Sequence, residues 1–235
     1  MNPTCSLLQT LTPETLARLI DHTCLKPHGP RAQIEQLCQE AREHGFAMVA
    51  IHPAQIQLCK RLLAGTAVHV GAAVGFPLGQ NTPQTKAFEA RDAIDQGADE
   101  LDMVINLRAL EAGELSLVQR EIRDLVAVCR PARAISKVIL ETCYLNDEQK
   151  RAVCQIAVDE GADFVKTSTG FGPAGAMLSD VRLMRAAVGQ RAGVKAAGGI
   201  RTLAQVQALL DAGATRIGTS NSVAILAELA HRPHP

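Results

Sequence analysis

The sequence predicts a single-domain (β/α)8 barrel, and three features support this fold class. Short apolar runs alternate with amphipathic segments along the 235 residues, as in parallel strands joined by crossover helices. A helix–glycine–strand pattern recurs in AREHGFAMVAI, AIDQGADELDMVI, AVDEGADFVKT and LLDAGATRIGT, and glycine commonly follows a helix because it accepts a left-handed conformation. About eight strand–helix units fit a length typical of a compact barrel. A doubly wound open sheet is the competing architecture.

The strands are expected where apolar residues follow one another, since the strands of a parallel barrel are buried on both faces. In chain order, the predicted strands are Leu19–Thr23, Phe46–Ile51, Val68–Gly75, Glu100–Ile105, Ile135–Leu140, Asp163–Lys166, Gly193–Ala196 and Thr215–Gly218. The helical patterns between them include Thr82–Gln96, Asp147–Glu160, Thr202–Ala212 and Ser220–Ala230. Because no Pro- or Ser-rich linker interrupts this order, residues 1–235 are expected to form one domain, with flexible tails at 1–10 and 231–235.

The composition argues against several classes of partner. Lys+Arg and Asp+Glu both number 24, so the net charge gives no support for binding to nucleic acid or to an anionic membrane. Aromatic residues make up only 3% of the chain and Trp is absent, which argues against a base-stacking surface. Neither a signal peptide nor a membrane span is evident. The 7 cysteines lack CxxC spacing and are interpreted as reduced, mostly buried thiols of a cytoplasmic protein.

Two lysines occupy positions where lysine is unexpected. Lys166 in DFVKTSTGF and Lys195 in GVKAAGGI lie late in apolar strands and precede loops of small residues. Burying an unpaired ammonium group is costly. Two such lysines therefore indicate chemistry that uses an amine, with Schiff-base formation on a carbonyl substrate as the natural candidate. The alternative is that they are solvated strand ends or members of buried ion pairs.

Asp102 is expected to face these lysines. In ELDMVIN, strand alternation places Leu101 and Met103 on one side and Asp102 on the other. The apolar side fits the layer that faces the helices, so Asp102 is predicted to point into the barrel. Two ammonium groups about 6 Å apart repel by roughly 3 kcal/mol at an effective dielectric near 20, which lowers the pKa of one lysine from about 10.4. Asp102 would hold the charged lysine and shuttle a proton; which lysine is the nucleophile stays open.

Two loops predict a phosphate site. AAGGIRT carries Gly198 and Gly199 after one strand, and RIGTSNSV carries Gly218, Ser220 and Asn221 at the end of the next. Backbone N–H groups at a helix N-terminus bind phosphate, and barrels often build this site after strands seven and eight. The two loops together indicate a phosphorylated substrate, whereas a tight turn would explain either one alone.

No metal site is predicted. The histidines at 22, 28, 44, 52, 69, 231 and 234 show neither HxH nor HExxH spacing. His22 and His52 fall near predicted strand ends. They could line the pocket there, but a hydrogen-bonded structural role is favoured for both.

The chain resembles the deoxyribose-phosphate aldolase family over nearly its whole length, from Asp21 to Val223. The matching stretches are IDHTCLKP, VGFPLGQNTPQTKAFEA, GADELDMVIN, KVILETCYL, GADFVKTSTGF, KAAGGIRT and RIGTSNSV. The resemblance implies a class I aldolase on a TIM barrel, without metal or other cofactor. Such an enzyme would cleave 2-deoxy-D-ribose 5-phosphate reversibly to D-glyceraldehyde 3-phosphate and acetaldehyde. It would act in the cytoplasm in deoxynucleoside breakdown, and we expect a homodimer.

The resemblance also implies a role for each candidate residue. Lys166 would be the Schiff-base lysine, and Asp102 and Lys195 would be the proton donor/acceptor pair beside it. Asp21 and Thr23 would help to line the sugar site. The phosphate would be held by the two loops that contain Gly198, Gly199, Gly218, Ser220 and Asn221.

The sequence departs from the family pattern at several positions. His52 stands where Asn or Tyr is more common, and Ala50 stands where Cys is common. Phe171 occupies a position that is lysine in some members, which would remove one possible phosphate contact. The C-terminal HRPHP lacks the tyrosine that some members bring toward the active site. These changes bear on rate, acceptor range and phosphate affinity rather than on the class of reaction.

Other functions stay open on the sequence alone. Another Schiff-base aldolase or transaldolase would also use a lysine, but it would prefer a ketose phosphate. A non-catalytic sugar-phosphate-binding barrel would keep the phosphate loops without needing two facing lysines and Asp102. A metal-dependent aldolase is disfavoured by the scattered histidines.

Overall fold

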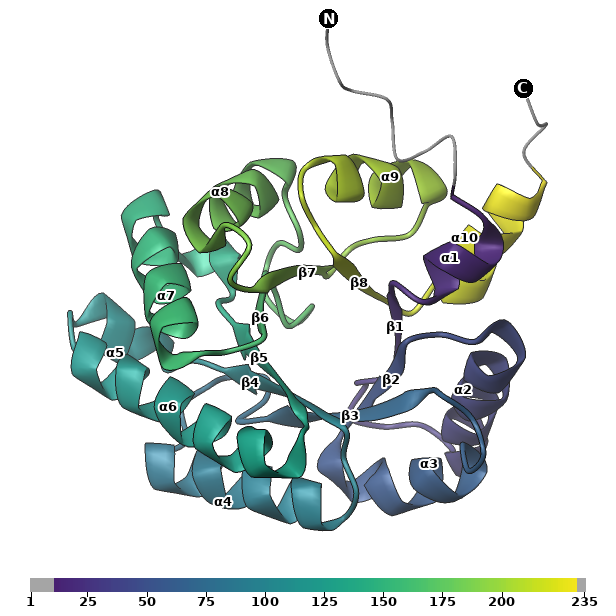
Figure 1. Ribbon diagram of the computed structural model, residues 1–235, viewed down its shortest axis with the longest axis horizontal. Helices are drawn as coiled ribbons and strands as arrows, with labels where there is room; N and C mark the ends of the chain where they lie inside the picture. Colours follow the sequence, from purple (N-terminus) through teal and green to yellow (C-terminus); the bar gives the residue numbers. More distant parts are fainter. Residues whose placement is uncertain (1–10, 232–235) are drawn as a thin grey trace, which may run out of the picture.

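Residues 11–231 are described by a computed structural model, and within them eight parallel strands close into a barrel (Figure 1). Each strand pairs with the next one in the sequence, and β8 pairs with β1. The strands are β1 (Ile20–Thr23), β2 (Met48–Ile51), β3 (His69–Val74), β4 (Glu100–Val104), β5 (Ile135–Ile139), β6 (Phe164–Lys166), β7 (Gly193–Ala197) and β8 (Arg216–Thr219). The predicted barrel is confirmed, and the open sheet is excluded.

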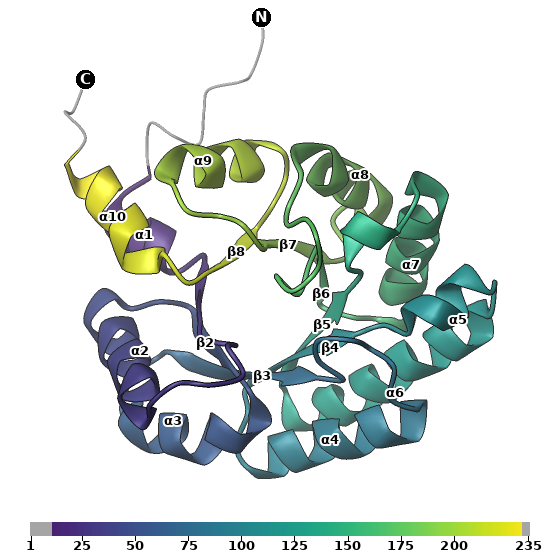
Figure 2. The same cartoon turned by 180° about the vertical axis from the view of Figure 1, so that it is seen from behind.

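Helices surround the barrel on its outer side (Figures 1 and 2). They are α1 (Pro13–Ala17), α2 (Arg31–His44), α3 (Ile56–Leu62), α4 (Pro83–Asp95), α5 (Leu107–Glu111), α6 (Leu115–Ala132), α7 (Asp147–Glu160), α8 (Leu178–Val188), α9 (Leu203–Asp211) and α10 (Ser222–Ala230), with short 3₁₀ turns at Pro53–Gln55 and Thr142–Tyr144. None of the described helices is long and apolar enough to cross a membrane. The tails predicted at 1–10 and 231–235 lie outside the described residues, except for His231, which follows α10.

Local sequence signals set the ends of several helices. α7 has the predicted bounds, because Asn146 and Gln149 form a reciprocal capping box at its start and Gly161 ends it with φ 82°. α2 likewise ends at Gly45, with φ 68°. β2 begins at Met48 rather than at Phe46, and the Phe46 ring packs against His22, with ring centroids 4.9 Å apart.

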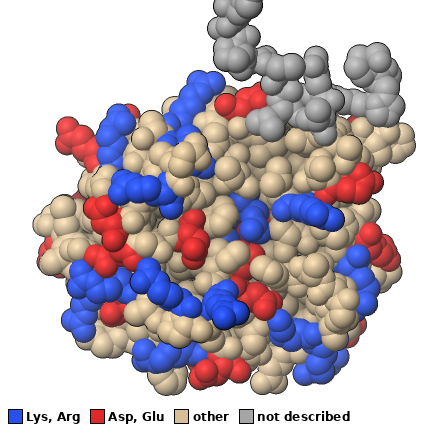
Figure 3. Space-filling view, in the orientation of Figure 1, with Lys and Arg blue, Asp and Glu red and all other residues tan. Residues whose placement is uncertain are grey.

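Strand alternation divides the buried side chains into two sets. Leu101, Met103 and Ile105 belong to the apolar core that packs against the helices. Asp102 faces the barrel interior, as predicted, and contacts Lys166 and other interior groups. No single sign of charge covers the face drawn in Figure 3, where basic and acidic side chains are interspersed.

Candidate active site

Three lysines converge on one buried carboxylate. The Nζ atoms of Lys166 and Lys195 lie 2.8 and 2.6 Å from Oδ2 of Asp102. Nζ of Lys137 lies 2.8 Å from the other oxygen, Oδ1. All four side chains are buried. The structure thus brings together Asp102 and the two lysines singled out in the sequence, and adds a third lysine.

The strand register explains why these side chains meet. Lys166 and Lys195 are Cα partners across β6 and β7, and Asp102 is the partner of Lys137 across β4 and β5. Since Lys166 and Lys195 donate to the same oxygen, their nitrogens lie closer together than the separation of about 6 Å assumed from the sequence.

Lys137 was missed by the sequence reasoning. It lies within ISKVI, an apolar strand, which is the same signal that selected the other lysines, but no loop of small residues follows it. Besides Asp102, it contacts Glu100, a second buried carboxylate. Lys137 lies in the barrel layer below Lys166, since its strand partner on β6 is Phe164.

Asp21 lies beneath the lysines, within the ion-pair network. Its carboxylate is 2.5 Å from Nζ of Lys195 and 2.7 Å from Nη1 of Arg216. Asp21 is fully buried, whereas Thr23, two positions along the same strand, lines the cavity above. Of these two candidate sugar-site residues, Thr23 is therefore the one in position to meet a ligand.

Burial and neighbouring charges set the protonation of the cluster. Burial lowers the pKa of Lys166 to about 8, and the ammonium groups of Lys195 and Lys137 contribute in the same direction, against the opposing effect of Asp102. Burial alone would raise the pKa of Asp102, but the three lysines together hold it well below its usual range. The pKa of Lys137 is raised by Asp102 and Glu100, which outweigh its burial. Lys166 is therefore suited to supply a neutral amine near neutral pH.

A cavity of about 660 Å³ opens above the lysine cluster. Its walls include Lys166, Lys195 and Thr23. Gly198 and Gly199 also line it, both with positive φ (89° and 74°). The remaining sequence-predicted residues on its walls are Gly218, Ser220 and Asn221.

Gly218 has a second role that the sequence did not indicate. It lies within β8, and a Cβ there would be 3.1 Å from Cε of Lys195 and 3.0 Å from Cβ of Ala197. Such contacts are tighter than ordinary van der Waals packing. Glycine at this position thus leaves room for the Lys195 side chain.

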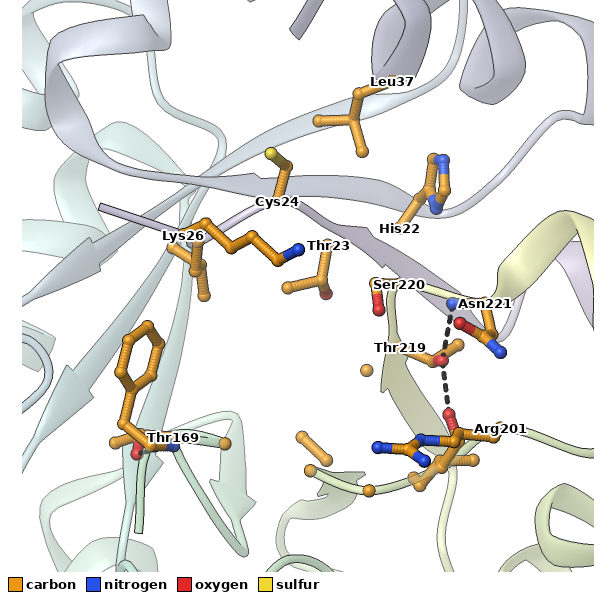
Figure 4. Close-up of a pocket in the computed structure, with 18 of the residues that line it drawn as sticks. His22, Thr23, Cys24, Lys26, Leu37, Thr169, Arg201, Thr219, Ser220 and Asn221 are labelled. Atoms are coloured by element: carbon orange, nitrogen blue, oxygen red, sulfur yellow. Dashed lines mark hydrogen bonds between the residues drawn. The ribbon is translucent and has the colours of Figure 1, made fainter. Parts of the chain in front are cut away.

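Two cationic side chains, Lys26 and Arg201, also line the cavity and were not predicted. In Figure 4 they extend from opposite sides, Lys26 from beside Thr23 and Arg201 from the side of Thr219 and Asn221. Arg201 directly follows the AAGGI segment, so its place beside a predicted phosphate loop could have been recognised. The position of Lys26 at the cavity could not have been recognised, because it depends on how the loop after β1 folds.

Phe171 lines the cavity and is backed by other rings. It meets Phe76 edge to face, with ring centroids 5.4 Å apart. Phe76 in turn packs against His52, with centroids 5.8 Å apart. Nε2 of His52 is 3.0 Å from the carbonyl oxygen of Leu25, so this histidine is tied to the loop after β1.

His22 and the other histidines do not assemble a metal site. Nδ1 of His22 is 2.9 Å from Oγ of Ser222, and its Nε2 is 2.7 Å from Glu40. Within residues 11–231, no group of three or more His, Cys, Asp and Glu side chains is arranged to hold a metal ion.

Comparisons with known proteins agree with this geometry. Residues 15–226 match the model of the family described as DeoC/LacD family aldolase. A deoxyribose-phosphate aldolase of Bacteroides thetaiotaomicron is 59% identical over 220 residues, covering 94% of this chain and 92% of that protein. Another, from Thermoanaerobacter sp. (strain X514), is 51% identical over 214 residues, covering 91% of this chain and 96% of that protein.

A solved structure has the same fold over nearly the whole chain. The deoxyribose phosphate aldolase from Aeropyrum pernix, described as a unique tetramer, superposes with a TM-score of 0.87 at 33% sequence identity. The match covers 94% of this chain and 93% of that one.

Proposed function

Since this chain belongs to the DeoC/LacD family of aldolases, we propose that it cleaves 2-deoxy-D-ribose 5-phosphate reversibly to D-glyceraldehyde 3-phosphate and acetaldehyde. The chain is a carbon–carbon lyase, and the substrate is inferred from the names of its relatives together with the chemistry of the cavity. One observation carries the proposal: a lysine with a lowered pKa, Lys166, lies at the base of a cavity with cationic and backbone groups suited to phosphate.

Lys166 is the proposed Schiff-base nucleophile. It has one carboxylate partner among residues 11–231, Asp102, whereas Lys137 and Lys195 each have two. Lys137 does not line the cavity. A neutral amine is the form that attacks a carbonyl. Burial outweighs the effect of Asp102 at Lys166 and lowers its pKa, whereas at Lys137 two carboxylates outweigh burial and raise the pKa.

The reaction begins when the amine of Lys166 attacks the aldehyde carbon C1, and loss of water gives an iminium. Removal of the proton from the C3 hydroxyl then lets the C2–C3 bond break, releasing D-glyceraldehyde 3-phosphate. The electron pair of that bond moves to C2 and into the iminium, leaving a neutral enamine rather than a free carbanion. A proton added at C2 regenerates an iminium, and water hydrolyses it to acetaldehyde and free Lys166. The iminium is the electron sink, so the steps need no metal or other cofactor.

Asp102 and Lys195 are the proposed proton donor/acceptor pair. Oδ2 of Asp102 is within hydrogen-bond distance of both Lys166 and Lys195, so it can exchange protons with either amine, and Lys195 lines the cavity. Asp102 also keeps the Lys195 ammonium close to Lys166, where its charge disfavours protonation of the nucleophile.

The phosphate is proposed to lie between the loops after β7 and β8. Gly198, Gly199 and Ser220 offer backbone N–H groups, and Arg201 and Lys26 offer positive charge from opposite sides of the cavity. Arg201 and Lys26 thus supply positive charge for the phosphate, which the uncharged Phe171 does not. Thr23 lines the cavity beside Lys26 and is proposed to contact the sugar.

We further propose that the enzyme acts in the cytoplasm in deoxynucleoside breakdown and as a homodimer. Light scattering of the purified protein tests the assembly, since a homodimer of a 25.0 kDa chain should have about twice that mass.

Borohydride reduction in the presence of acetaldehyde, followed by peptide mass mapping, tests the nucleophile. We expect one reduced adduct, on Lys166, and Lys166→Ala should abolish both adduct and turnover with the fold intact by circular dichroism. An adduct on Lys195 would exchange the roles of the two lysines. A folded protein with no adduct would favour a sugar-phosphate-binding barrel, and preference for a ketose phosphate would favour a different Schiff-base aldolase.

A further inference from the structure

Glu141 is a buried residue with an unfavourable backbone conformation at the active-site end of the barrel. It follows β5 and adopts φ 54° and ψ 62°. Among residues 11–231, the other non-glycine residue with positive φ is Arg133, at the end of α6. The left-handed region costs free energy for a residue with a Cβ, and such conformations persist where the surrounding structure requires them. The Glu141 side chain should therefore have a role that glycine would not fill.

The Glu141 carboxylate binds one residue of the loop after β6. The backbone N–H of Thr169 donates to both carboxylate oxygens, at 3.2 and 3.3 Å, and the Thr169 hydroxyl donates to Oε2. The same hydroxyl oxygen accepts the N–H of Phe171 at 3.0 Å. Glu141 thus fixes the segment Thr169–Phe171, which lines the cavity.

This segment packs directly against the loop after β7. A Cβ on Gly198 would lie 3.5 Å from Cα of Gly170 and 3.4 Å from Cβ of Ser168, so the two loops meet backbone to backbone. Farther along the first loop, the Ala176 N–H donates to the carbonyl oxygen of Gly198 at 3.1 Å. A change at Thr169 would therefore be transmitted to Gly198 without passing through the lysine cluster.

We propose that Glu141 is a positioning residue for the phosphate subsite. Its carboxylate fixes Thr169, the fixed segment supports Gly198, and Gly198 with Gly199 presents backbone N–H groups to the phosphate. This inference rests on the proposed function, because it assigns those glycines to a substrate phosphate. Glu141 itself does not line the cavity, so its effect is on phosphate binding rather than on the reacting atoms.

The test compares substrate binding with Schiff-base formation in the same variants. Glu141→Ala should raise KM for 2-deoxy-D-ribose 5-phosphate about tenfold, equivalent to about 1.4 kcal/mol, with kcat within about twofold of wild type. The Glu141 carboxylate interacts electrostatically with Lys166, so formation of the reduced acetaldehyde adduct is compared well above pH 8, where the Lys166 amine is neutral. There it should be unchanged, because acetaldehyde carries no phosphate. Glu141→Gln retains one oxygen acceptor, so its KM should be close to that of the wild type. If Glu141→Ala fails to fold, Thr169→Val removes only the hydroxyl and should raise KM in the same direction.

Arg133→Ala is the matched control. It places alanine at the same kind of positive-φ position (56°), on an exposed residue away from the cavity, and should leave both KM and adduct formation unchanged. An unchanged KM in the Glu141 and Thr169 variants would overturn the inference, as would a loss of adduct formation equal to the loss of phosphate binding. A wild-type protein that forms the adduct but does not cleave 2-deoxy-D-ribose 5-phosphate would overturn the proposed substrate, and the inference with it.

Discussion

At the scale of single residues, three buried lysines with one shared carboxylate differ in what surrounds each amine. Lys137 contacts Glu100 and Asp102, and Lys195 contacts Asp21 and Asp102, whereas Lys166 pairs with one carboxylate among the described residues, that of Asp102. The proposed nucleophile is thus the lysine of the cluster that pairs with one carboxylate rather than two. This arrangement also makes Lys195 responsible for part of the lowered pKa of Lys166.

Removing the Lys195 charge should move the pH dependence of Schiff-base formation upward. Attack requires the neutral amine, so adduct formation rises as pH passes the pKa of Lys166, about 8 in the wild type. In Lys195→Met the repulsion disappears and the pKa of Lys166 increases. The midpoint should then move up by about two pH units, from a repulsion of about 3 kcal/mol and 1.36 kcal/mol per pH unit. The measurement is the rate of borohydride-trapped acetaldehyde adduct against pH.

Lys150→Met is the control for this change. Lys150 lies on α7 and pairs with Asp180 at 2.7 Å, away from the cavity. Its removal should leave the midpoint where it is. If Lys195→Met also leaves the midpoint unchanged, repulsion between the two amines is not what tunes Lys166.

The place of a residue in the barrel could be predicted from the sequence where the pattern lay within a single strand and its following loop. Alternation within ELDMVIN placed Asp102 inside the barrel, and the small-residue loops after Lys166 and Lys195 marked both lysines. Lys137 was passed over because its place opposite Asp102 depends on the pairing of β4 with β5. Glu141 carries no local signal, since its importance arises from contact with a loop 28 positions away in the sequence.

At the scale of elements, the end of β4 is fixed from outside the barrel by an ion pair between α4 and α6. Nζ of Lys86 lies 2.6 Å from Oε2 of Glu121 and 2.7 Å from the carbonyl oxygen of Val104. The other Glu121 oxygen accepts the N–H of Asn106 at 2.6 Å. Both charged side chains are buried. The pair therefore holds the strand just beyond Asp102.

Breaking this pair should destabilise the fold strongly. Lys86→Met leaves the Glu121 carboxylate buried without its charge partner, which costs about 3–5 kcal/mol. Adding Glu121→Gln should recover much of the loss, because an amide is neutral and still accepts from Asn106. Urea unfolding measures both free energies. As a comparison, Arg31→Met breaks an exposed pair with Glu35 and should cost less than about 1 kcal/mol. A similar cost for the two single variants would contradict the role given to the buried pair.

Element positions were largely predictable because their signals are local. Gly45, Gly161 and the Asn146 cap fix helix ends within a few residues of sequence. The cavity walls were predictable only in part, since they are made where loops from different strands meet. Lys26 and Arg201 come from the loops after β1 and β7, and no spacing in the sequence relates them.

At the scale of the whole molecule, the barrel interior is filled in part by a charge network rather than by apolar layers. Glu100 joins Lys137, His69 and Arg216, the last at 3.6 Å. Burial would raise the pKa of Glu100, but Lys137, His69 and Arg216 lower it to about 2. Because the pKa of Glu100 is lower in the folded state than in the unfolded state, its ionised carboxylate stabilises the fold at pH values above the unfolded-state pKa. That contribution to stability is lost as the pH falls toward 2.

Acid should therefore destabilise the fold by protonating a carboxylate inside the barrel. Between pH 7 and pH 2, Glu100 alone should account for a loss of about 3 kcal/mol, from a reference value near 4.5 and a folded value of about 2. Urea unfolding across this pH range measures the loss, and Glu100→Gln should flatten the dependence. The exposed Glu35→Gln should not change it. Parallel curves for wild type and Glu100→Gln would show that the acid sensitivity arises elsewhere.

The pairing of β8 with β1 has a consequence for how the protein is made. Arg216 on β8, the last strand of the barrel in chain order, compensates Asp21 on β1 and Glu100 on β4. A nascent chain that ends before β8 contains Lys166, Asp102 and Lys195, but it lacks the strand that closes the barrel around them. Because burial is the main cause of the lowered pKa of Lys166, the neutral amine depends on closure of the barrel by β8, and a chain without this strand has unpaired edges on β1 and β7.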